Sequence, residues 1–506
     1  MDGHLLMIRR YRSIVVAAVL ASTALVASVV ASGCGSTNCS FTATCVGASV
    51  GPGAEGGSDV SIIDGGTDAP LDPCVNTPSD PKCLDETTAL FVSTKADASM
   101  ADGSRAHPFK TIMAGLAAVS TTRKRVYVCE GDYLENVSVQ ATVSVLGGLT
   151  CDWTGKGANP RIAPPKGVAM SIVKSTGVVV TDVNVEGDAD AQVDGDSAIA
   201  LFVSESTATL LRRVSASAGA GTKGAKGADG DVAPNYTSVG APPGLTTTTS
   251  LAAAAPVCGV CTDGSSSSGG KGAASGGLPA TGGASSPVGI DNAGASGTST
   301  CVAGKPGAPG PAAIAAAAAI APGTLKATGW ESAISASKGP TGNPAQGGGG
   351  GGSTTTPAFG GGSGGCGGCG GSGGAAGGNG GSSFALLSFN SDVTIEDGTL
   401  TATAGGIGGK GGKGQDGQFR GGAGTGACAG GEGGHGAGGG GAGGGAGGHS
   451  AAIAHSGNAP VTTNTMLKHA AESAAGDGGG GGASTGNPGN PGANGAKGSA
   501  ADRLPL

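Results

Sequence analysis

Glycine is the feature that most limits what this chain can fold into, because it supplies 107 of the 506 residues. Each glycine loses more backbone entropy on folding than any other residue, and it adds no side chain to a core. Aromatic residues make up only 3% of the chain and charged residues only 12%. A conventional large hydrophobic core is therefore excluded. Long segments must be either loops or repetitive layers packed backbone to backbone.

The first 33 residues have the pattern of an export signal. Three arginines between positions 9 and 12 precede an apolar run from 14 to 30, which leads to Ala31-Ser32-Gly33-Cys34. This ending resembles the lipobox of bacterial lipoproteins, which implies cleavage before Cys34 and lipidation of that cysteine. An ordinary secretory signal with an incidental cysteine is the alternative. We expect an exported, lipid-anchored protein at the outer membrane or cell surface.

Charge and hydropathy limit the partners. The formal net charge of −7 argues against nucleic acid as a partner. After the leader, no further apolar span of about 18 residues occurs, so the mature chain is not expected to cross a bilayer as a helix. The membrane is therefore expected as a partner through the lipid anchor.

Cysteine usage predicts disulfides. Assigning Cys34 to lipid leaves an even number of cysteines in an oxidising compartment. Proximity in the sequence suggests the pairs Cys39 with Cys45, Cys74 with Cys83, Cys129 with Cys151, Cys258 with Cys261, and Cys366 with Cys369, which leaves Cys301 for Cys428. The two C-x-x-C pairs could instead be halves of a zinc site or redox motifs. Because both lie among glycines, we favour disulfides that tie loops.

Folding signals begin after a polar segment. Residues 34–86 are rich in Gly, Ser, Thr, Asp and Pro, which predicts a tether. A short strand is expected at Ala89–Ser93, and Pro108 suits the first turn of a helix. In that helix, four apolar residues recur on one face, namely Phe109, Ile112, Met113 and Leu116. From Arg125 onward the apolar pattern changes to a period of two, which is typical of strands.

The order of elements from Ala89 to Gly148 resembles a known fold. A strand, a polar loop, His-Pro-Phe-Lys-Thr-Ile at 107–112, Val-Tyr-Val at 126–128 and Gly-Asp-Tyr-x-Glu-Asn-Val at 131–137 are similar to the start of pectin-lyase-like proteins. This resemblance implies an all-β fold, a right-handed parallel β-helix solenoid with a short N-terminal capping helix. It speaks for the fold and not for chemistry.

Internal repeats independently support a solenoid built of repeated rungs. Met170-Ser171-Ile172 corresponds, 31 positions later, to Leu201-Phe202-Val203, and Ser197–Leu201 recurs as Ser383–Leu387. The inward residues of each rung are expected to stack into a continuous core. Two weaker copies begin near Ala312-Ala313-Ile314 and Ala451-Ala452-Ile453-Ala454.

Each repeat leads into a long glycine-rich insert, and we expect the inserts to project from one edge of the solenoid. They contain short Gly-x-y runs such as Gly304–Gly310 and Gly486–Gly498. A collagen triple helix would need many more triplets and three chains. Polyproline-II-like layers packed backbone to backbone and flexible loops are the alternatives that remain. In composition the inserts resemble PGRS repeats, and the chain resembles the glycine-rich PGRS family of bacterial lipoproteins.

One dense acidic cluster is the strongest candidate for metal chemistry. Its members Asp188, Asp190, Asp194 and Asp196 are candidate calcium ligands, and a solvated turn is the alternative. Arg212 and Arg213 follow on the next rung, and as strand neighbours they are expected to point to opposite faces.

Other catalytic signals are weak. No Ser-His-Asp or Cys-His arrangement and no phosphate loop stands out. Histidines in the glycine-rich part are either metal ligands or scattered surface residues, namely His435, His449, His455 and His469.

Together these features predict four segments: a signal peptide at 1–33, a tether at 34–86, N-terminal β-helix rungs at 87–217, and further rungs interrupted by glycine-rich loops at 218–506. We expect a non-enzymatic surface lipoprotein with a structural, adhesive or matrix-interacting role, whose partner is a polysaccharide or extracellular matrix. The alternative is a polysaccharide-binding or pectate-lyase-like polysaccharide-cleaving protein that uses calcium. Convergent carboxylates and a basic residue in a cleft on an exposed sheet would favour the alternative. Glycine loops covering that sheet would favour the surface role.

Overall fold

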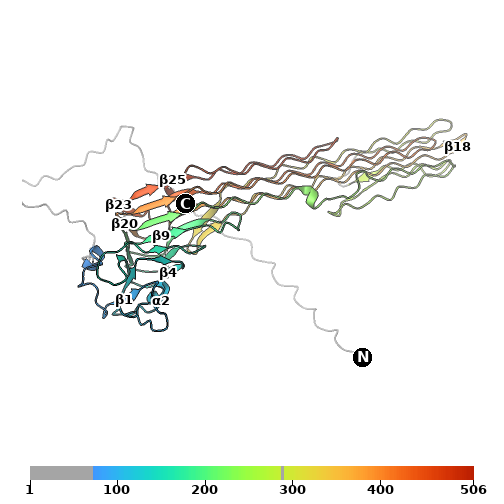
Figure 1. The fold of residues 1–506 in the computed structure, drawn as a ribbon. Coiled ribbons are helices and arrows are strands. Elements are labelled where there is room, and N and C mark those ends of the chain that lie inside the picture. Colours follow the sequence, from blue (N-terminus) through green and yellow to red (C-terminus); the bar gives the residue numbers. More distant parts are fainter. Residues whose placement is uncertain (1–71, 286–289) are drawn as a thin grey trace, which may run out of the picture. The chain divides into compact units, whose positions relative to one another are not determined.

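The computed structural model describes residues 72–285 and 290–506, which belong to one compact unit. The predicted signal peptide and the candidate residues Cys34, Cys39 and Cys45 lie outside the described residues. The described chain is nearly all β, as the sequence predicts (Figure 1). No helix in this part of the chain is both long enough and apolar enough to span a bilayer.

Most strands belong to three parallel sheets. Sheet A contains β1 (Ala89–Val92), β2 (Arg125–Cys129), β5 (Ser144–Leu149), β8 (Val179–Thr181), β11 (Thr209–Arg212), β20 (Val393–Glu396) and β23 (Val461–Thr463). Sheet B contains β3 (Asp132–Tyr133), β6 (Arg161–Ile162), β9 (Asn184–Gly187), β12 (Ser215–Ala218), β21 (Thr399–Ala402) and β24 (Met466–Lys468). Sheet C contains β4 (Val137–Val139), β7 (Met170–Val173), β10 (Ala198–Ser204), β19 (Ser383–Phe389), β22 (Ser450–Ser456) and β25 (Ala500–Pro505).

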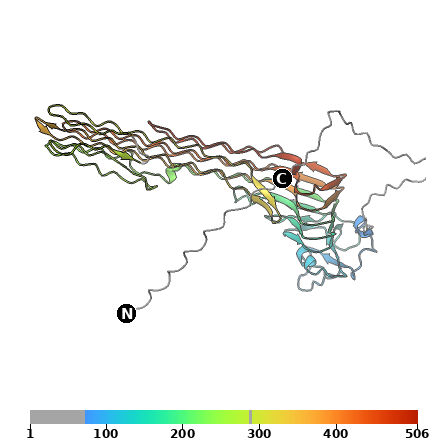
Figure 2. The same ribbon diagram turned by 180° about the vertical axis from the view of Figure 1, so that it is seen from behind.

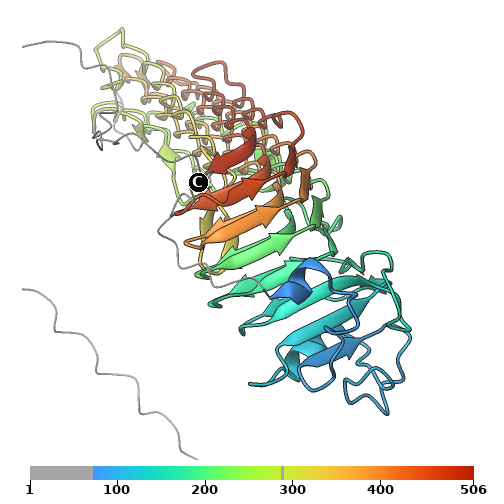
Figure 3. The ribbon, with the colours of Figure 1, turned by 90° about the vertical axis from the view of Figure 1, so that its left-hand side faces the viewer.

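Successive strands lie in different sheets, so that three of them form one rung. β7, β8 and β9 lie in sheets C, A and B, and β10, β11 and β12 repeat this order in the next layer (Figure 3). Leu201 pairs with Met170, and Leu211 pairs with Val180. These pairs confirm the predicted spacing of 31 residues between the two rungs.

One hydrophobic core runs between the sheets. Its side chains come mainly from Val, Ile and Leu, which suit the inward face of a strand. Helix α2 (Ile112–Ala117) covers the core beside β1 and β2, with Thr111 as its N-cap. The carboxylate of Glu135 accepts hydrogen bonds from the first two backbone N–H groups of this helix, at 2.7 and 3.0 Å. Ile112 is buried as predicted, but Met113 is exposed.

The structure corrects one predicted strand register. The sequence aligned Ser197 with Ser383, whereas Ala198 pairs with Ser383 and Ile199 pairs with Phe384. A slip of one residue turns every side chain to the other face of a sheet. The sequence could not reveal it, because every residue of β10 and nearly every residue of β19 is buried and the apolar pattern does not alternate.

Two sheets are covered on their outer faces as well. On sheet C, Phe202 and Phe384 pack with Leu325 and Trp330 from the hairpin of β15 (Gly323–Lys326) and β16 (Gly329–Ser332). The rings of Trp330 and Phe384 meet edge to face at a centroid distance of 5.0 Å. This hairpin comes from the first glycine-rich insert, so part of an insert covers the face of a sheet.

Sheet A is covered by the segment that precedes β1. This segment contains α1 (Pro73–Asn76) and the predicted disulfide between Cys74 and Cys83. The hydroxyl of Tyr127 on β2 donates a hydrogen bond of 3.0 Å to the carbonyl of Cys83. Residues 72–86, which the sequence analysis assigned to the tether, therefore pack against the sheets.

The long inserts leave the sheets at one corner, as the sequence predicts. In the described chain they span residues 219–382, 403–449 and 469–499, and each runs from a strand of sheet B to a strand of sheet C. An earlier rung closes the same corner with the short link 188–197. The two ends of an insert lie close together, since the Ser383 hydroxyl donates to the Ala218 carbonyl at 3.3 Å.

The inserts form a layered bundle of extended chains, called the glycine bundle below (Figure 2). Between any two neighbouring chains, a backbone hydrogen bond recurs at every third residue. The N–H groups of Gly406, Gly409 and Gly412, for example, donate to the carbonyls of Gly381, Gly378 and Ala375 at 2.7–2.9 Å. A period of three is that of a polyproline-II helix. Of the two alternatives left by the sequence, the structure has packed layers.

A chain with more close neighbours in the bundle has more glycines in each three-residue repeat. In Gly347–Gly352 every residue is glycine, and successive N–H groups donate to three different neighbouring segments. In the outer chain Gly304–Gly310, only every third residue is glycine and faces the bundle. The predicted copy near Ala312 belongs to this outer chain and is not a rung. Its alanines at every third position replace glycine on the inner side.

Short elements interrupt the bundle. They are η1 (Gly230–Val232) and the hairpins of β13 (Ser267–Ser268) with β14 (Ala284–Ser285) and of β17 (Thr354–Thr355) with β18 (Ala358–Phe359).

Candidate functional site

The acidic cluster lies in the link 188–197, which connects β9 to β10, and its hydrogen bonds fix the conformation of this link. Asp196 accepts a hydrogen bond from the backbone N–H of Asp190 at 2.6 Å, and its own N–H donates to Thr222 at 2.7 Å. Across residues 72–285 and 290–506, no three His, Cys, Asp or Glu side chains are placed to hold a metal ion. The structure therefore does not bring Asp188, Asp190, Asp194 and Asp196 together as a calcium site.

Both candidate arginines are held by carboxylates of neighbouring rungs. The Arg213 guanidinium donates to the two carboxylate oxygens of Asp182 at 2.7 Å each, and this contact raises the pKa of Arg213. Arg212 ends β11 and lies 3.4 Å from Glu396. Arg213 lies beyond the strand at a φ of +51°, so the two residues do not alternate along one strand as expected. Their side chains stabilise a corner between rungs.

The four candidate histidines do not form a cluster. His449 is buried, and its Nδ1 accepts a hydrogen bond of 2.9 Å from the N–H of Ser499. Burial lowers the pKa of His449 to about 4. His469 pairs with Asp502 at 2.9 Å, and His455 lies on β22. His435 packs edge to face on Phe419, as described below.

The disulfides of the bundle correct the predicted pairing. Cys258 bonds with Cys366 and Cys261 with Cys369, whereas the sequence paired each C-x-x-C within itself. Residues three apart in a polyproline-II chain are roughly 9 Å apart, which is too far for a disulfide. Both bonds span 108 residues, so they link two adjacent chains at successive turns. The predicted pairs Cys74–Cys83, Cys129–Cys151 and Cys301–Cys428 are confirmed.

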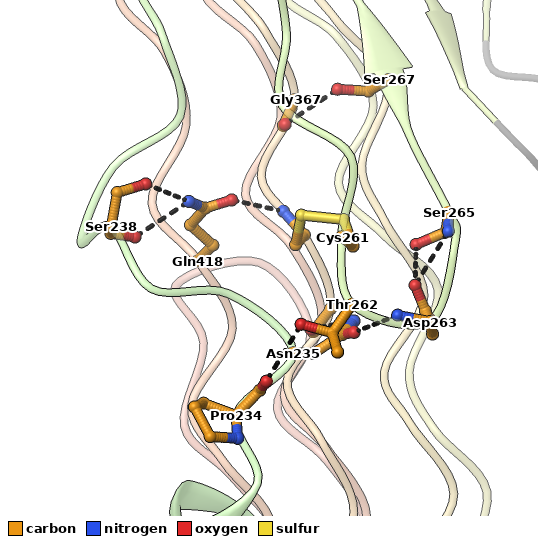
Figure 4. The surroundings of a disulfide bond; sticks show 12 residues. Pro234, Asn235, Ser238, Cys261, Thr262, Asp263, Ser265, Ser267, Gly367 and Gln418 are labelled. Carbon is orange, nitrogen blue, oxygen red and sulfur yellow. Dashed lines mark hydrogen bonds between the residues drawn. A yellow bond between two sulfur atoms is a disulfide. The ribbon is translucent and has the colours of Figure 1, made fainter.

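Beside these disulfides, residues 231–240 interrupt the repeat of the outer chain. Before this segment, the N–H of Gly227 donates to the carbonyl of Lys410, and after it the N–H of Gly244 donates to the carbonyl of Gly422. The difference in residue number between hydrogen-bonded partners is therefore five smaller after the segment, so the outer chain contains five extra residues here. The extra residues bulge out of the layer. The long amide side chains of Asn235 and Gln418 link the bulge to the chains beside it (Figure 4).

Buried hydrogen bonds fix this bulge. Asn235 donates from its side chain to the Gly370 carbonyl at 3.0 Å, and its backbone N–H donates to the side chain of Gln415 at 2.8 Å. Gln418 donates to the Ser238 carbonyl at 2.9 Å and accepts from the N–H of Cys369 at 2.9 Å (Figure 4). Loop 231–240 is therefore tied to the disulfide-linked chains beneath it.

A pocket of about 390 Å³ opens next to the bulge. Its floor is the chain 416–419, which lies between two neighbouring chains of the bundle. One neighbour contributes the bulge, and the other contributes the bend after Ala483 where the last insert turns back. The lining residues are Tyr236, Val239, Asp416, Gly417, Phe419, Ala483, Ser484 and Thr485.

The pocket combines apolar walls with a few polar groups. The Tyr236 hydroxyl donates to the Asp416 carbonyl, and Phe419 is half exposed while its ring packs on His435 at 5.7 Å. Only four aromatic residues occur in the three inserts, and two of them line this pocket. The carboxylate of Asp416 accepts from the N–H of Ala483 at 2.7 Å.

Two ion pairs lie beside the pocket. Lys413 lies 3.2 Å from Asp416, and Arg420 lies 2.6 Å from Glu432. Burial raises the pKa of Tyr236 to about 12, and nearby carboxylates contribute to this rise. Burial, together with Arg420, lowers the pKa of His435. At neutral pH the pocket therefore presents a neutral phenol, and two ion pairs lie beside it.

The sequence does not predict this pocket. Its residues come from three inserts whose neighbour relations follow from hydrogen bonding and not from sequence distance. The signal that could have found it is the break in the glycine triplets at 231–240, where bulky residues such as Tyr236 and Val239 occur instead.

No protein-family model, no curated protein and no solved structure matches this chain. Its function is therefore inferred from its own geometry.

Proposed function

We propose that this protein is a non-enzymatic surface lipoprotein with an adhesive or matrix-interacting role, in which a right-handed parallel β-helix solenoid presents the glycine bundle. The observation that carries the proposal is the ordered bundle itself. Its chains are joined by backbone hydrogen bonds and by disulfides, so it offers a stiff surface with outward side chains at fixed intervals. Such a surface suits repeated contacts with a large partner.

The covering of the sheets supports this role over a cleaving role. The hairpin β15–β16 covers sheet C, and the segment around Cys74 covers sheet A. Sheet B carries Arg161 with two carboxylates, Asp132 at 3.5 Å and Glu186 at 2.5 Å. This group meets in part the expectation of convergent carboxylates and a basic residue, but its members are paired with one another, and Glu186 raises the pKa of Arg161.

Anchoring at Cys34 rests on the sequence motif. Changing Cys34 to Ser is expected to release the protein from membranes. If the variant still sediments with washed membranes, the anchor lies elsewhere in the chain.

A trimmed variant tests the adhesive role. In this variant, each of the three inserts is replaced by a copy of link 188–197, which closes the same corner in an earlier rung. Phe202 and Leu387 are changed to Thr, because the hairpin no longer covers them. Cells displaying the trimmed variant are expected to lose adhesion to matrix or polysaccharide. Adhesion equal to that of cells with the full protein would contradict the proposal.

Polysaccharide binding is the second candidate, and the aromatic pocket favours it. Aromatic walls with a few polar groups are typical of sites for small ligands. Binding without cleavage is compatible with the adhesive role, and the absence of released reducing ends in a polysaccharide assay is the expected result.

A further inference from the structure

We propose that the pocket between Tyr236 and Phe419 binds a single neutral pyranose unit of a polysaccharide. This inference rests on the proposed adhesive function and names the chemistry of its partner. The size of the pocket suits one sugar unit, because about 390 Å³ lies at the lower end of the roughly 300–1,000 Å³ usual for ligand pockets. One sugar ring fits such a volume, and a longer chain can continue across the open rim.

The walls of the pocket have the composition that a sugar needs. A pyranose has an apolar face of C–H groups, which packs on aromatic rings, and a rim of hydroxyls, which needs hydrogen-bond partners. The pocket offers both kinds of surface. Tyr236, Val239 and Phe419 provide apolar area, while Ser484 and Thr485 provide hydroxyls. The Asp416 carboxylate, which is exposed, provides acceptors for sugar hydroxyls.

The charges beside the pocket favour a neutral sugar. The ion pairs Lys413–Asp416 and Arg420–Glu432 leave no unbalanced positive charge among these groups to attract an acidic sugar. A uronic acid would bring its carboxylate close to that of Asp416, and like charges in a partly desolvated site repel. The pocket therefore selects a neutral sugar over an acidic one.

The pocket is held rigidly by the bundle. Loop 231–240 is an irregularity in an otherwise regular layer, yet it is held by the buried side chains of Asn235 and Gln418. Two disulfides lie directly beneath it, and one of them joins Cys261 to Cys369 (Figure 4). A preorganised pocket loses less entropy on binding than a mobile loop.

Binding of the full mature protein to immobilised dextran, galactomannan and xylan tests the proposal, with polygalacturonate as the acidic comparison. The wild-type protein is expected to bind at least one neutral polysaccharide and to bind polygalacturonate more weakly. Tyr236→Ala and Phe419→Ala are each expected to weaken that binding at least tenfold. Phe359→Ala is the matched control, because it removes an exposed aromatic ring of the same bundle that does not line the pocket.

Asp416→Asn tests the selectivity. This substitution keeps an acceptor for the N–H of Ala483 but removes the charge, so binding to polygalacturonate is expected to rise. Thermal unfolding of each variant monitors the fold. If Tyr236→Ala lowers the unfolding midpoint, the half-exposed Phe419 carries the test alone.

Three results would overturn the proposal: no binding of the wild type to any neutral polysaccharide, preference for polygalacturonate, or unchanged binding by the Phe419 variant. The adhesion assay separates these failures from failure of the proposed function. If the trimmed variant loses adhesion while the pocket variants adhere normally, the adhesive role stands and the sugar pocket is rejected. If the trimmed variant still adheres, the adhesive role of the bundle is rejected.

Discussion

At the scale of single residues, glycine acts in this protein mainly through the space it leaves. A Cβ atom on Gly364 would overlap the carbonyl group of Gly348 in the adjacent chain. The same atom on Gly422, in the same bundle, would meet nothing within 4 Å. Glycine is therefore required where chains approach closely and is replaceable where they do not.

Gly364→Ala and Gly422→Ala form a matched pair that tests this reading. Overpacking at Gly364 is expected to lower the free energy of unfolding by about 1–3 kcal/mol. At Gly422 the change is expected to be neutral, or to stabilise by about 0.4–1 kcal/mol through the unfolded state. Denaturant unfolding measures both values. Equal effects at the two positions would mean that the chains are not packed as described.

The buried side chain of His449 is expected to make the free energy of unfolding depend on pH. Its folded-state pKa of about 4 is lower than its ordinary value of 6.5, because burial disfavours the charged ring. The unfolded chain therefore takes up a proton first as pH falls. Stability from the neutral ring is complete above pH 6.5 and declines as the pH falls towards 4, by about 3 kcal/mol in all.

His449→Gln should flatten this part of the stability curve, because glutamine keeps an acceptor for the N–H of Ser499 and does not titrate. Urea unfolding at several pH values between 7 and 4 measures the slope. His469→Gln is the control for the substitution itself, because His469 lies at the surface beside Asp502 whereas His449 is buried. A wild-type slope in the His449 variant would reject the assignment.

At the scale of elements, the paired disulfides report the alignment of two bundle chains. Local pairing looked reasonable in the sequence, because Cys258 and Cys261 are near neighbours. The local pairing is wrong because one turn of a polyproline-II helix places residues three apart farther from each other than a disulfide allows. Chain conformation, which sequence spacing does not contain, therefore decides the connectivity.

Thiol titration of double variants checks this alignment. Cys258→Ser with Cys366→Ser should leave no additional free thiol relative to the wild type, since Cys261 and Cys369 remain bonded. Cys258→Ser with Cys261→Ser should instead expose two thiols, on Cys366 and Cys369. The reverse result would restore the local pairing. Because both bonds close nearly the same loop, losing one is expected to cost much less than the roughly 4–5 kcal/mol expected for losing both.

The elements differ in how well the sequence predicted them. The strands around Met170 and Leu201 were predictable, since their apolar residues repeat after 31 positions. The pairing of Ile199 with Phe384 was not, because both faces of these strands are buried and a one-residue slip leaves the pattern equally apolar. The shared edge from which the inserts leave the sheets was predictable, because each insert follows the same part of a repeat. The pocket at Tyr236 was not predictable from the sequence.

At the scale of the whole molecule, the question is whether the sheets depend on the bundle. The core between the sheets contains side chains from the strands and α2 and none from the bundle, which argues that the sheets fold without it. The ends of each insert also lie close together, as at Thr403 and Ser450, where the hydroxyl donates to the carbonyl at 2.7 Å. A short link can therefore replace an insert without strain, and loop length itself contributes only weakly to stability.

The last prediction concerns what the sheets lose when the bundle is removed. With all three inserts replaced by link 188–197, the protein is expected to keep its strand signal in circular dichroism and to unfold cooperatively. It is also expected to self-associate, because the hairpin with Leu325 and Trp330 no longer covers the apolar outer face of sheet C. Adding Phe202→Thr and Leu387→Thr to the same trimmed chain should restore a monomer, which analytical ultracentrifugation measures. A coil spectrum for both versions would mean that the sheets need the bundle to fold, and a monomer without the two threonines would mean that the hairpin does not shield this face.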